Sequence, residues 1–184
     1  MRLVPRRIPV PDQVRGALDA DEVVLTSALA ADGTTVAATR KRLMVLAGTE
    51  LRSIGWSQMA KARLDAGTLT VVPLQPVMVL PDGTAVLRDA VPLIFAFDRP
   101  AGITDQVHSR VRRSVAASRY LPWPGGAGGW VTTRRVAGQD GLVLQIRLDP
   151  GADPQAPGFL EAALRAGAEL LGRDTVAGAT GVDE

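Results

Sequence analysis

Short segments rich in β-branched and apolar residues alternate with turn signals along most of the chain. Three Asp-Gly dipeptides, at 32–33, 82–83 and 140–141, each separate two such segments. Asp-Gly between strand-like segments is a strong hairpin signal, because a type I′ turn needs a positive φ at both central residues. We predict hairpins joining residues 22–31 to 34–39, 77–80 to 84–88 and 130–137 to 142–148, and further strands at 42–47, 51–56, 69–74 and 92–97. Connections this short predict antiparallel pairing.

One helix is predicted from an apolar repeat of four residues. Ile103, Val107, Val111 and Val115 recur at this spacing, which on a helix draws an apolar stripe about 120° wide. We predict a helix over residues 104–119 with this stripe laid on a core.

A second helix is predicted over residues 157–171. Pro157 suits the first helical position and Gly172 is the expected stop. Leu160 and Leu164 belong to one apolar row and Phe159 to an adjacent one. So wide an apolar face must be covered by the rest of the fold or by another chain.

Proline and glycine mark the boundaries between these elements. The segment LPWPGGAGG at 121–129 forbids regular structure and is predicted to be a linker. The predicted layout is an N-terminal arm (1–20), an antiparallel β body closed by a helix (21–120), this linker, a hairpin-helix appendage (130–172) and a disordered tail (173–184). The fold class is therefore α+β.

The composition excludes several kinds of site. The 184 residues contain no cysteine and one histidine, which removes disulfides, thiolate metal sites and cysteine nucleophiles. The net charge is only +2, which gives no strong reason to expect a nucleic-acid partner. Since no apolar stretch has the length of a signal or a spanning helix, the default expectation is a cytoplasmic protein.

Candidate catalytic residues are few and none is assigned a role. His108 stands alone and is interpreted as a boundary residue of the first helix. The glycines at 125–129 lack the Lys-Ser/Thr of a phosphate loop and are interpreted as part of the linker. Asp149, Asp153 and Glu161 lie near turn dipeptides, and nothing predicts that they form an acid/base pair. We predict no catalytic, cofactor-binding or metal-binding residues, no cofactor, and no enzymatic activity.

Basic and aromatic residues suggest surfaces rather than catalytic sites. Arg40, Lys41 and Arg42 form a basic turn, whereas Arg110, Arg112, Arg113 and Arg119 spread around the solvent half of the first helix. Trp56 is expected in the core beside Ile54. Trp123 either anchors the linker by packing, which we favour, or forms an exposed contact.

The segments TRKRLMV at 39–45 and RSIGWSQM at 52–59 resemble bacterial pleckstrin-homology-like (PH-like) domains. The resemblance spans roughly residues 21–120. It implies a bent antiparallel sandwich or barrel closed by a C-terminal amphipathic helix, which would be the helix beginning near Ile103. Lipid-binding members of the family carry basic residues in the first hairpin, whereas this chain has AADGT at 30–34.

Three functions remain open. The leading hypothesis is a non-catalytic binding or scaffold module that recognises a protein partner or another copy of itself, at a sheet edge or through the last helix. The second is peripheral association with an anionic membrane surface or, less favoured, nucleic acid, through the basic turn and the Arg-bearing helix. The third is an enzyme with an unrecognised site.

Overall fold

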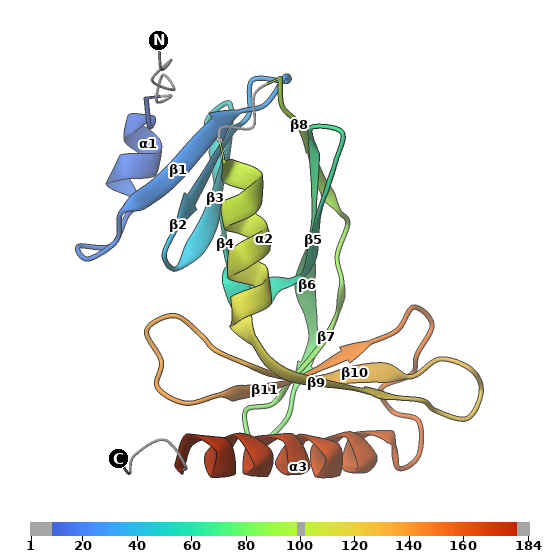
Figure 1. Ribbon diagram of the computed structural model, residues 1–184. Helices are drawn as coiled ribbons and strands as arrows, with labels where there is room; N and C mark the ends of the chain where they lie inside the picture. The colour runs from blue at the N-terminus through green and yellow to red at the C-terminus, as the bar shows by residue number, and fades with distance from the viewer. Residues whose placement is uncertain (1–8, 99–101, 180–184) are drawn as a thin grey trace. The chain divides into compact units, whose positions relative to one another are not determined.

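The computed structural model describes residues 9–98 and 102–179, with side chains described up to residue 172 (Figure 1). The described residues form a mixed α+β fold that is mostly sheet, as predicted. In chain order the elements are α1 (Asp12–Gly16), β1 (Val24–Leu29), β2 (Thr35–Thr39), β3 (Arg42–Ala47), β4 (Glu50–Gly55), a 3₁₀ turn (Trp56–Gln58), β5 (Met59–Asp65), β6 (Thr68–Val79), β7 (Ala85–Asp89), β8 (Leu93–Ala96), α2 (Ile103–Ser114), β9 (Val115–Leu121), β10 (Gly129–Arg134), β11 (Val143–Leu148) and α3 (Phe159–Ala179).

The chain divides into two compact units. Unit 1 comprises Met1–Pro73 and Val91–Arg112, and unit 2 comprises Leu74–Ala90 and Arg113–Glu184. Strand β6 therefore begins in unit 1 and ends in unit 2. The predicted β body at 21–120 contributes residues to both units, and the predicted linker and appendage lie in unit 2. The first eight residues of the predicted arm and residues 180–184 of the predicted tail lie outside the described residues.

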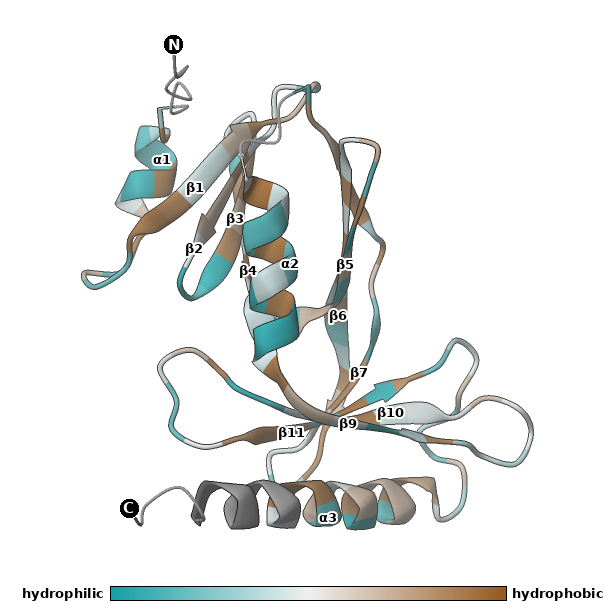
Figure 2. Cartoon of the chain, in the orientation of Figure 1, coloured by the Kyte–Doolittle hydropathy of each residue, from teal (hydrophilic) through white to brown (hydrophobic). Residues whose placement is uncertain are grey.

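Unit 1 is built from two antiparallel sheets, the helix α2 and the short helix α1. Strands β1 to β4 pair in chain order, and β6 pairs with β5 on one side and β8 on the other. Inward-facing side chains such as Val36, Leu43 and Leu69 share one core with the α2 stripe. The stripe residues Ile103, Val107 and Val111 are all buried, as predicted from their spacing. In Figure 2 the same helix shows both apolar and polar sides.

The other face of the first sheet is covered by α1, a helix that sequence patterning missed. Val14 is fully buried and packs with Ala37 and Met44. Because β2 (TVAAT) is buried on both faces, its small alanines allow the close approach of the helix.

Unit 2 is one sheet with a helix on one face. The sheet order is β6, β7, β11, β10, β9, and α3 lies along it (Figure 1). Phe159, Ala163 and Leu170 of α3 are buried against a cluster that includes Val131 and Ile146. The wide apolar face predicted for this helix is thus largely covered by its own unit.

All three predicted hairpins are confirmed, but the first two turns are not type I′. Gly33 and Gly83 both have φ near +86, whereas Asp32 and Asp82 do not have positive φ. Each Asp instead accepts a hydrogen bond at 2.9 Å from the backbone N–H two residues later, and each Gly takes the left-handed position of a three-residue loop. The third connection is longer and spans residues 135–142.

Several sequence-based boundaries were wrong. The first helix ends at Ser114 rather than Arg119, because Val115–Leu121 forms strand β9 and pairs with β10. The four-residue apolar spacing extends to Val115, but Val115 is already in the strand. The last helix begins at Phe159 and passes through Gly172 to Ala179, since one glycine costs a helix only about 1 kcal/mol and no second stop signal follows. Strand β5 was missed because its alternating residues are mostly small or charged.

The expectation of purely antiparallel pairing was also wrong at one place. Strand β11 pairs with β7 in parallel through Gln145↔Ala85 and Arg147↔Leu87. Short connections constrain only strands that follow one another in the chain, and these two are separated by more than a dozen residues.

Candidate functional site

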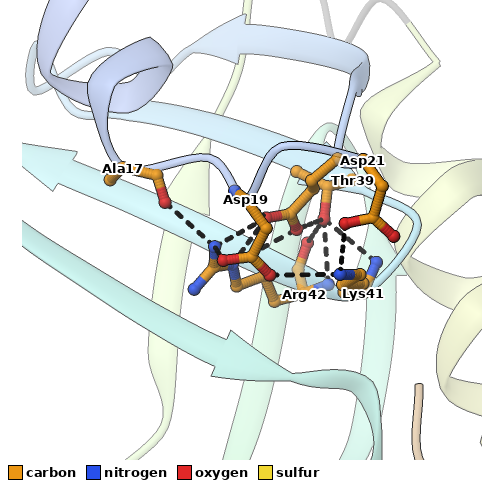
Figure 3. Close-up of polar contacts among 7 residues, drawn as sticks. Ala17, Asp19, Asp21, Thr39, Lys41 and Arg42 are labelled. Atoms are coloured by element: carbon orange, nitrogen blue, oxygen red, sulfur yellow. Dashed lines mark hydrogen bonds and ion pairs between the residues drawn. The ribbon is translucent and has the colours of Figure 1, made fainter. Parts of the chain in front are cut away.

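The predicted basic turn is held inside an ion-pair network of unit 1 (Figure 3). The Lys41 ammonium lies 2.7 Å from Asp21 and 3.1 Å from Asp19. The Arg42 guanidinium donates to Glu22, with its shortest contact at 2.6 Å, and to the carbonyl oxygen of Ala17 at 2.9 Å. Two of the three cations in this turn are therefore neutralised by carboxylates of the same chain.

Glu22 is the buried centre of this network. Its side chain has no exposed surface, and it accepts a hydrogen bond from the Thr39 hydroxyl at 2.5 Å in addition to those from Arg42. Burial alone would raise the pKa of Glu22, but the hydrogen bonds from Arg42 and Thr39 outweigh it and the pKa is lowered. The network thus fixes the segment before β1 to the β2–β3 turn and is structural.

The arginines predicted on the first helix do not form one surface. Arg110, Arg112 and Arg113 are on α2, but Arg119 lies on β9 and pairs with Glu169 of α3 at 2.6 Å.

Aromatic side chains gather at one end of unit 2. Of seven aromatic residues in the chain, four are in this unit: Tyr120, Trp123, Trp130 and Phe159. They lie where the β9–β10 loop meets the segment between β11 and α3. We call these four residues the aromatic end. Since so few aromatic residues are available, this concentration identifies the end of the sheet as the first candidate for a binding surface.

Two members of the aromatic end are exposed as a pair. Tyr120 and Trp130 are cross-strand partners with ring centroids 5.3 Å apart, and they keep 41% and 39% of their surface exposed. Their side chains lie on the sheet face opposite Val131, which packs toward α3. The Tyr120 hydroxyl donates to Asp149 at 2.9 Å; this hydrogen bond raises the pKa of Tyr120 and fixes the ring.

The other two members line a small pocket. Trp123 and Phe159 meet edge to face, with centroids 5.3 Å apart. The pocket beside them has a volume of about 160 Å³ and is lined by the two rings, prolyl and glycyl groups, three alanines and one charged residue, Asp153. The predicted packing role of Trp123 is confirmed, and the segment interpreted as a linker is a hairpin loop that forms one wall.

Hydrogen bonds to the backbone hold both rims of this pocket. On one rim the Gly126 N–H donates to the Trp123 carbonyl oxygen at 3.2 Å. On the other, Asp153 accepts from the Gln155 N–H at 2.9 Å, and Arg88 donates to the Ala152 carbonyl oxygen at 2.6 Å. The site is therefore formed before any ligand arrives, which lowers the entropic cost of binding.

A second unusual feature of unit 2 is the buried Arg134 on β10. It is 4% exposed and donates to the Ser114 hydroxyl at 2.8 Å, but no carboxylate among the described residues pairs with it. Burial lowers its pKa to about 10, and the neighbouring Arg147 acts in the same direction. Its Nε has no hydrogen-bond partner among the described residues. Within that part of the chain the charge of Arg134 is thus uncompensated.

We expect Arg134→Met to stabilise the protein by about 1–3 kcal/mol, because an uncompensated buried charge is replaced by an apolar chain of similar length. Urea denaturation at pH 7 measures this, with exposed Arg135→Met as a control that should change stability by less than about 0.5 kcal/mol. A loss of stability in Arg134→Met would show that the Ser114 hydrogen bond outweighs the cost of burial.

The other sequence candidates remain separate. His108 is exposed on α2, and Asp149, Asp153 and Glu161 form no ion pair or hydrogen bond with one another. Trp56 is buried in the unit 1 core as predicted, with its indole N–H donating to the Arg40 carbonyl oxygen at 3.1 Å. In the described part of the chain, no three His, Cys, Asp or Glu residues gather to hold a metal ion.

Sequence reasoning missed the aromatic end. Tyr120 was placed just beyond a helix, and the pairing of Trp123 with Phe159 joins residues far apart in sequence. The available signal was the spacing of Tyr120, Trp123 and Trp130, three of the seven aromatic residues of the chain within eleven positions.

Comparison with known proteins gives no relative. No family model matches the chain, and no curated protein or solved structure matches it. Among the described helices, none combines the length and apolarity needed to cross a bilayer.

Proposed function

We propose that the protein is a non-catalytic binding module that recognises a protein partner, or a second copy of itself, through the aromatic end of unit 2. The observation that carries this proposal is the exposed Tyr120–Trp130 pair, which lies on the sheet face opposite α3. The pocket lined by Trp123 and Phe159 belongs to the loops at the same end of the unit. Tyrosine and tryptophan are enriched at the energetic centres of protein interfaces, because each supplies a large rigid contact area and a polar group.

The arrangement of unit 1 supports its proposed assignment as a PH-like domain. Four strands pair in chain order, a second sheet of β5, β6 and β8 follows, and α2 contributes to the shared core. In this interpretation residues 74–90 are an insertion into the last hairpin of the domain. Together with the segment after α2 they form unit 2.

The electrostatic alternative has less support. Lys41 and Arg42 are occupied by Asp19, Asp21 and Glu22, so much of the basic turn is unavailable to phosphate groups. Binding to anionic lipid or nucleic acid depends on cations that can replace bound counterions.

The enzymatic alternative has no specific support from the pocket. Asp153 is the single ionisable residue lining it, and it is exposed and already accepts a hydrogen bond from the Gln155 N–H. A general acid or base must lie within hydrogen-bond reach of the proton that it transfers, and one exposed carboxylate does not indicate such a position.

Affinity purification of the tagged protein from its native host at about 50 mM and about 500 mM salt tests the proposed function. Surface charge interactions are largely screened at the higher concentration, whereas aromatic packing is not. We expect a near-stoichiometric protein that stays bound at both concentrations. Retention of only lipid or nucleic acid that is released by salt would overturn the proposal in favour of the electrostatic alternative.

A further inference from the structure

We infer that the pocket of the aromatic end receives a basic side chain, lysine or arginine, from the bound partner. This inference rests on the proposed function and adds the chemical class of the group recognised.

The size of the pocket suits one side chain. Its volume of about 160 Å³ is close to that of a cavity that holds a benzene molecule, about 150 Å³. Small-molecule sites usually measure about 300–1,000 Å³. The pocket is therefore too small for a typical cofactor and large enough for a single anchor residue.

The charge of the pocket selects among anchor residues. Asp153 is the one charged residue that lines it, and only its Oδ1 is used, by the Gln155 N–H; Oδ2 makes no hydrogen bond among the described residues. Trp123 provides an aromatic surface of the kind that attracts cations. A lysine or arginine places its apolar stem against the rings and its charge beside the carboxylate.

Other anchor residues fit less well. An acidic side chain would be repelled by Asp153. An uncharged apolar side chain would displace water from the carboxylate without providing a hydrogen-bond donor, which carries a desolvation cost. The fixed rims also prevent the loop from turning the carboxylate away, since the Asp153 hydrogen bond to Gln155 holds it.

An NMR titration with two matched probes tests the inference. N-acetyl-lysine N-methylamide and its norleucine analogue share a four-carbon stem and differ by the ammonium group. With ¹⁵N-labelled protein we expect saturable shifts at the Trp123 indole and the Gly125 and Ala127 amides for the lysine probe, and binding about three- to tenfold weaker for norleucine.

The Asp153→Asn variant keeps an acceptor for the Gln155 N–H and removes the charge. We expect it to bind the lysine probe about two- to fivefold more weakly than the wild type. The control is Asp140→Asn, an exposed acid in the β10–β11 loop of the same unit, which should leave the titration unchanged. Equal binding of the two probes, no shift with either probe, or an unchanged Asp153→Asn variant would each overturn the inference.

Failure of this inference is distinguishable from failure of the proposed function. If the copurified protein is lost on removing the Tyr120 and Trp130 rings but binds Asp153→Asn normally, the binding module stands and the basic anchor is wrong. If the wild type retains no protein and is also monomeric in solution, the proposed function fails whatever the probes show.

Discussion

Replacing Glu22 by alanine is expected to lower the free energy of unfolding by about 3 kcal/mol. The substitution removes a carboxylate with no exposed surface and leaves Arg42, whose side chain is 24% exposed, without its closest partner. It also removes the acceptor of the Thr39 hydroxyl. A loss of this size is a large fraction of the 5–15 kcal/mol that typically stabilises a domain. Denaturant unfolding at pH 7 measures it.

The matched control for Glu22→Ala is Asp21→Asn in the same network. Asp21 pairs with Lys41 at 2.7 Å, but its side chain is 76% exposed, so solvent screens the interaction. We expect a loss below about 1 kcal/mol. Equal effects of the two substitutions would contradict the view that burial of Glu22 makes this network important for stability.

The pH dependence of stability follows from the same carboxylate. The pKa of Glu22 is lowered below its usual value of 4.5, so its contribution is fully present above that value and is lost as pH falls through the folded-state pKa. Acid should therefore destabilise the wild type more steeply below about pH 4.5 than it destabilises Glu22→Ala.

Removing both exposed rings of the aromatic end is expected to weaken partner binding at least about 30-fold. Tyr120→Ala/Trp130→Ala deletes the exposed aromatic pair, and interface hot spots contribute about 2 kcal/mol or more. Fluorescence anisotropy or calorimetry with the copurified partner measures the affinity.

The control for the double variant is Ile94→Ala, which shortens a 64% exposed apolar side chain of unit 1. We expect its affinity to remain within about twofold of the wild type, because most exposed positions contribute little to an interface. Thermal unfolding of each variant separates loss of the fold from loss of the surface. Equal affinity of the double variant and the wild type would place the binding surface elsewhere.

Local signals in the sequence predicted much of the fold. The Asp-Gly dipeptides located the hairpins because their turns depend only on adjacent residues. The Asp side chain accepts a hydrogen bond from the N–H two residues later, and the glycine takes a left-handed conformation. The spacing of Ile103, Val107 and Val111 located the buried face of α2 for a similar reason. The limit of this approach appears at Val115, where the spacing continues but pairing with β10 converts the chain to a strand.

The candidate site depended on contacts that no local pattern encodes. The sequence presents residues 40–42 as a basic cluster, and only the folded chain brings Glu22 and Asp21 beside them. The LPWPGGAGG segment has the composition of a linker, whereas its role in the pocket comes from packing of Trp123 on Phe159. Contacts between residues that are distant in sequence therefore neutralise most of the predicted basic turn. Contacts of the same kind form the pocket at Trp123, which the sequence does not predict.

The most direct test of the central claim compares the wild type and Tyr120→Ala/Trp130→Ala side by side in affinity purification from the native host at high salt. We predict that the wild type retains a near-stoichiometric protein that the folded double variant loses. The same protein retained by both would contradict the aromatic end as the binding surface. Retention of no protein by a wild type that is also monomeric in solution would contradict the binding-module account itself.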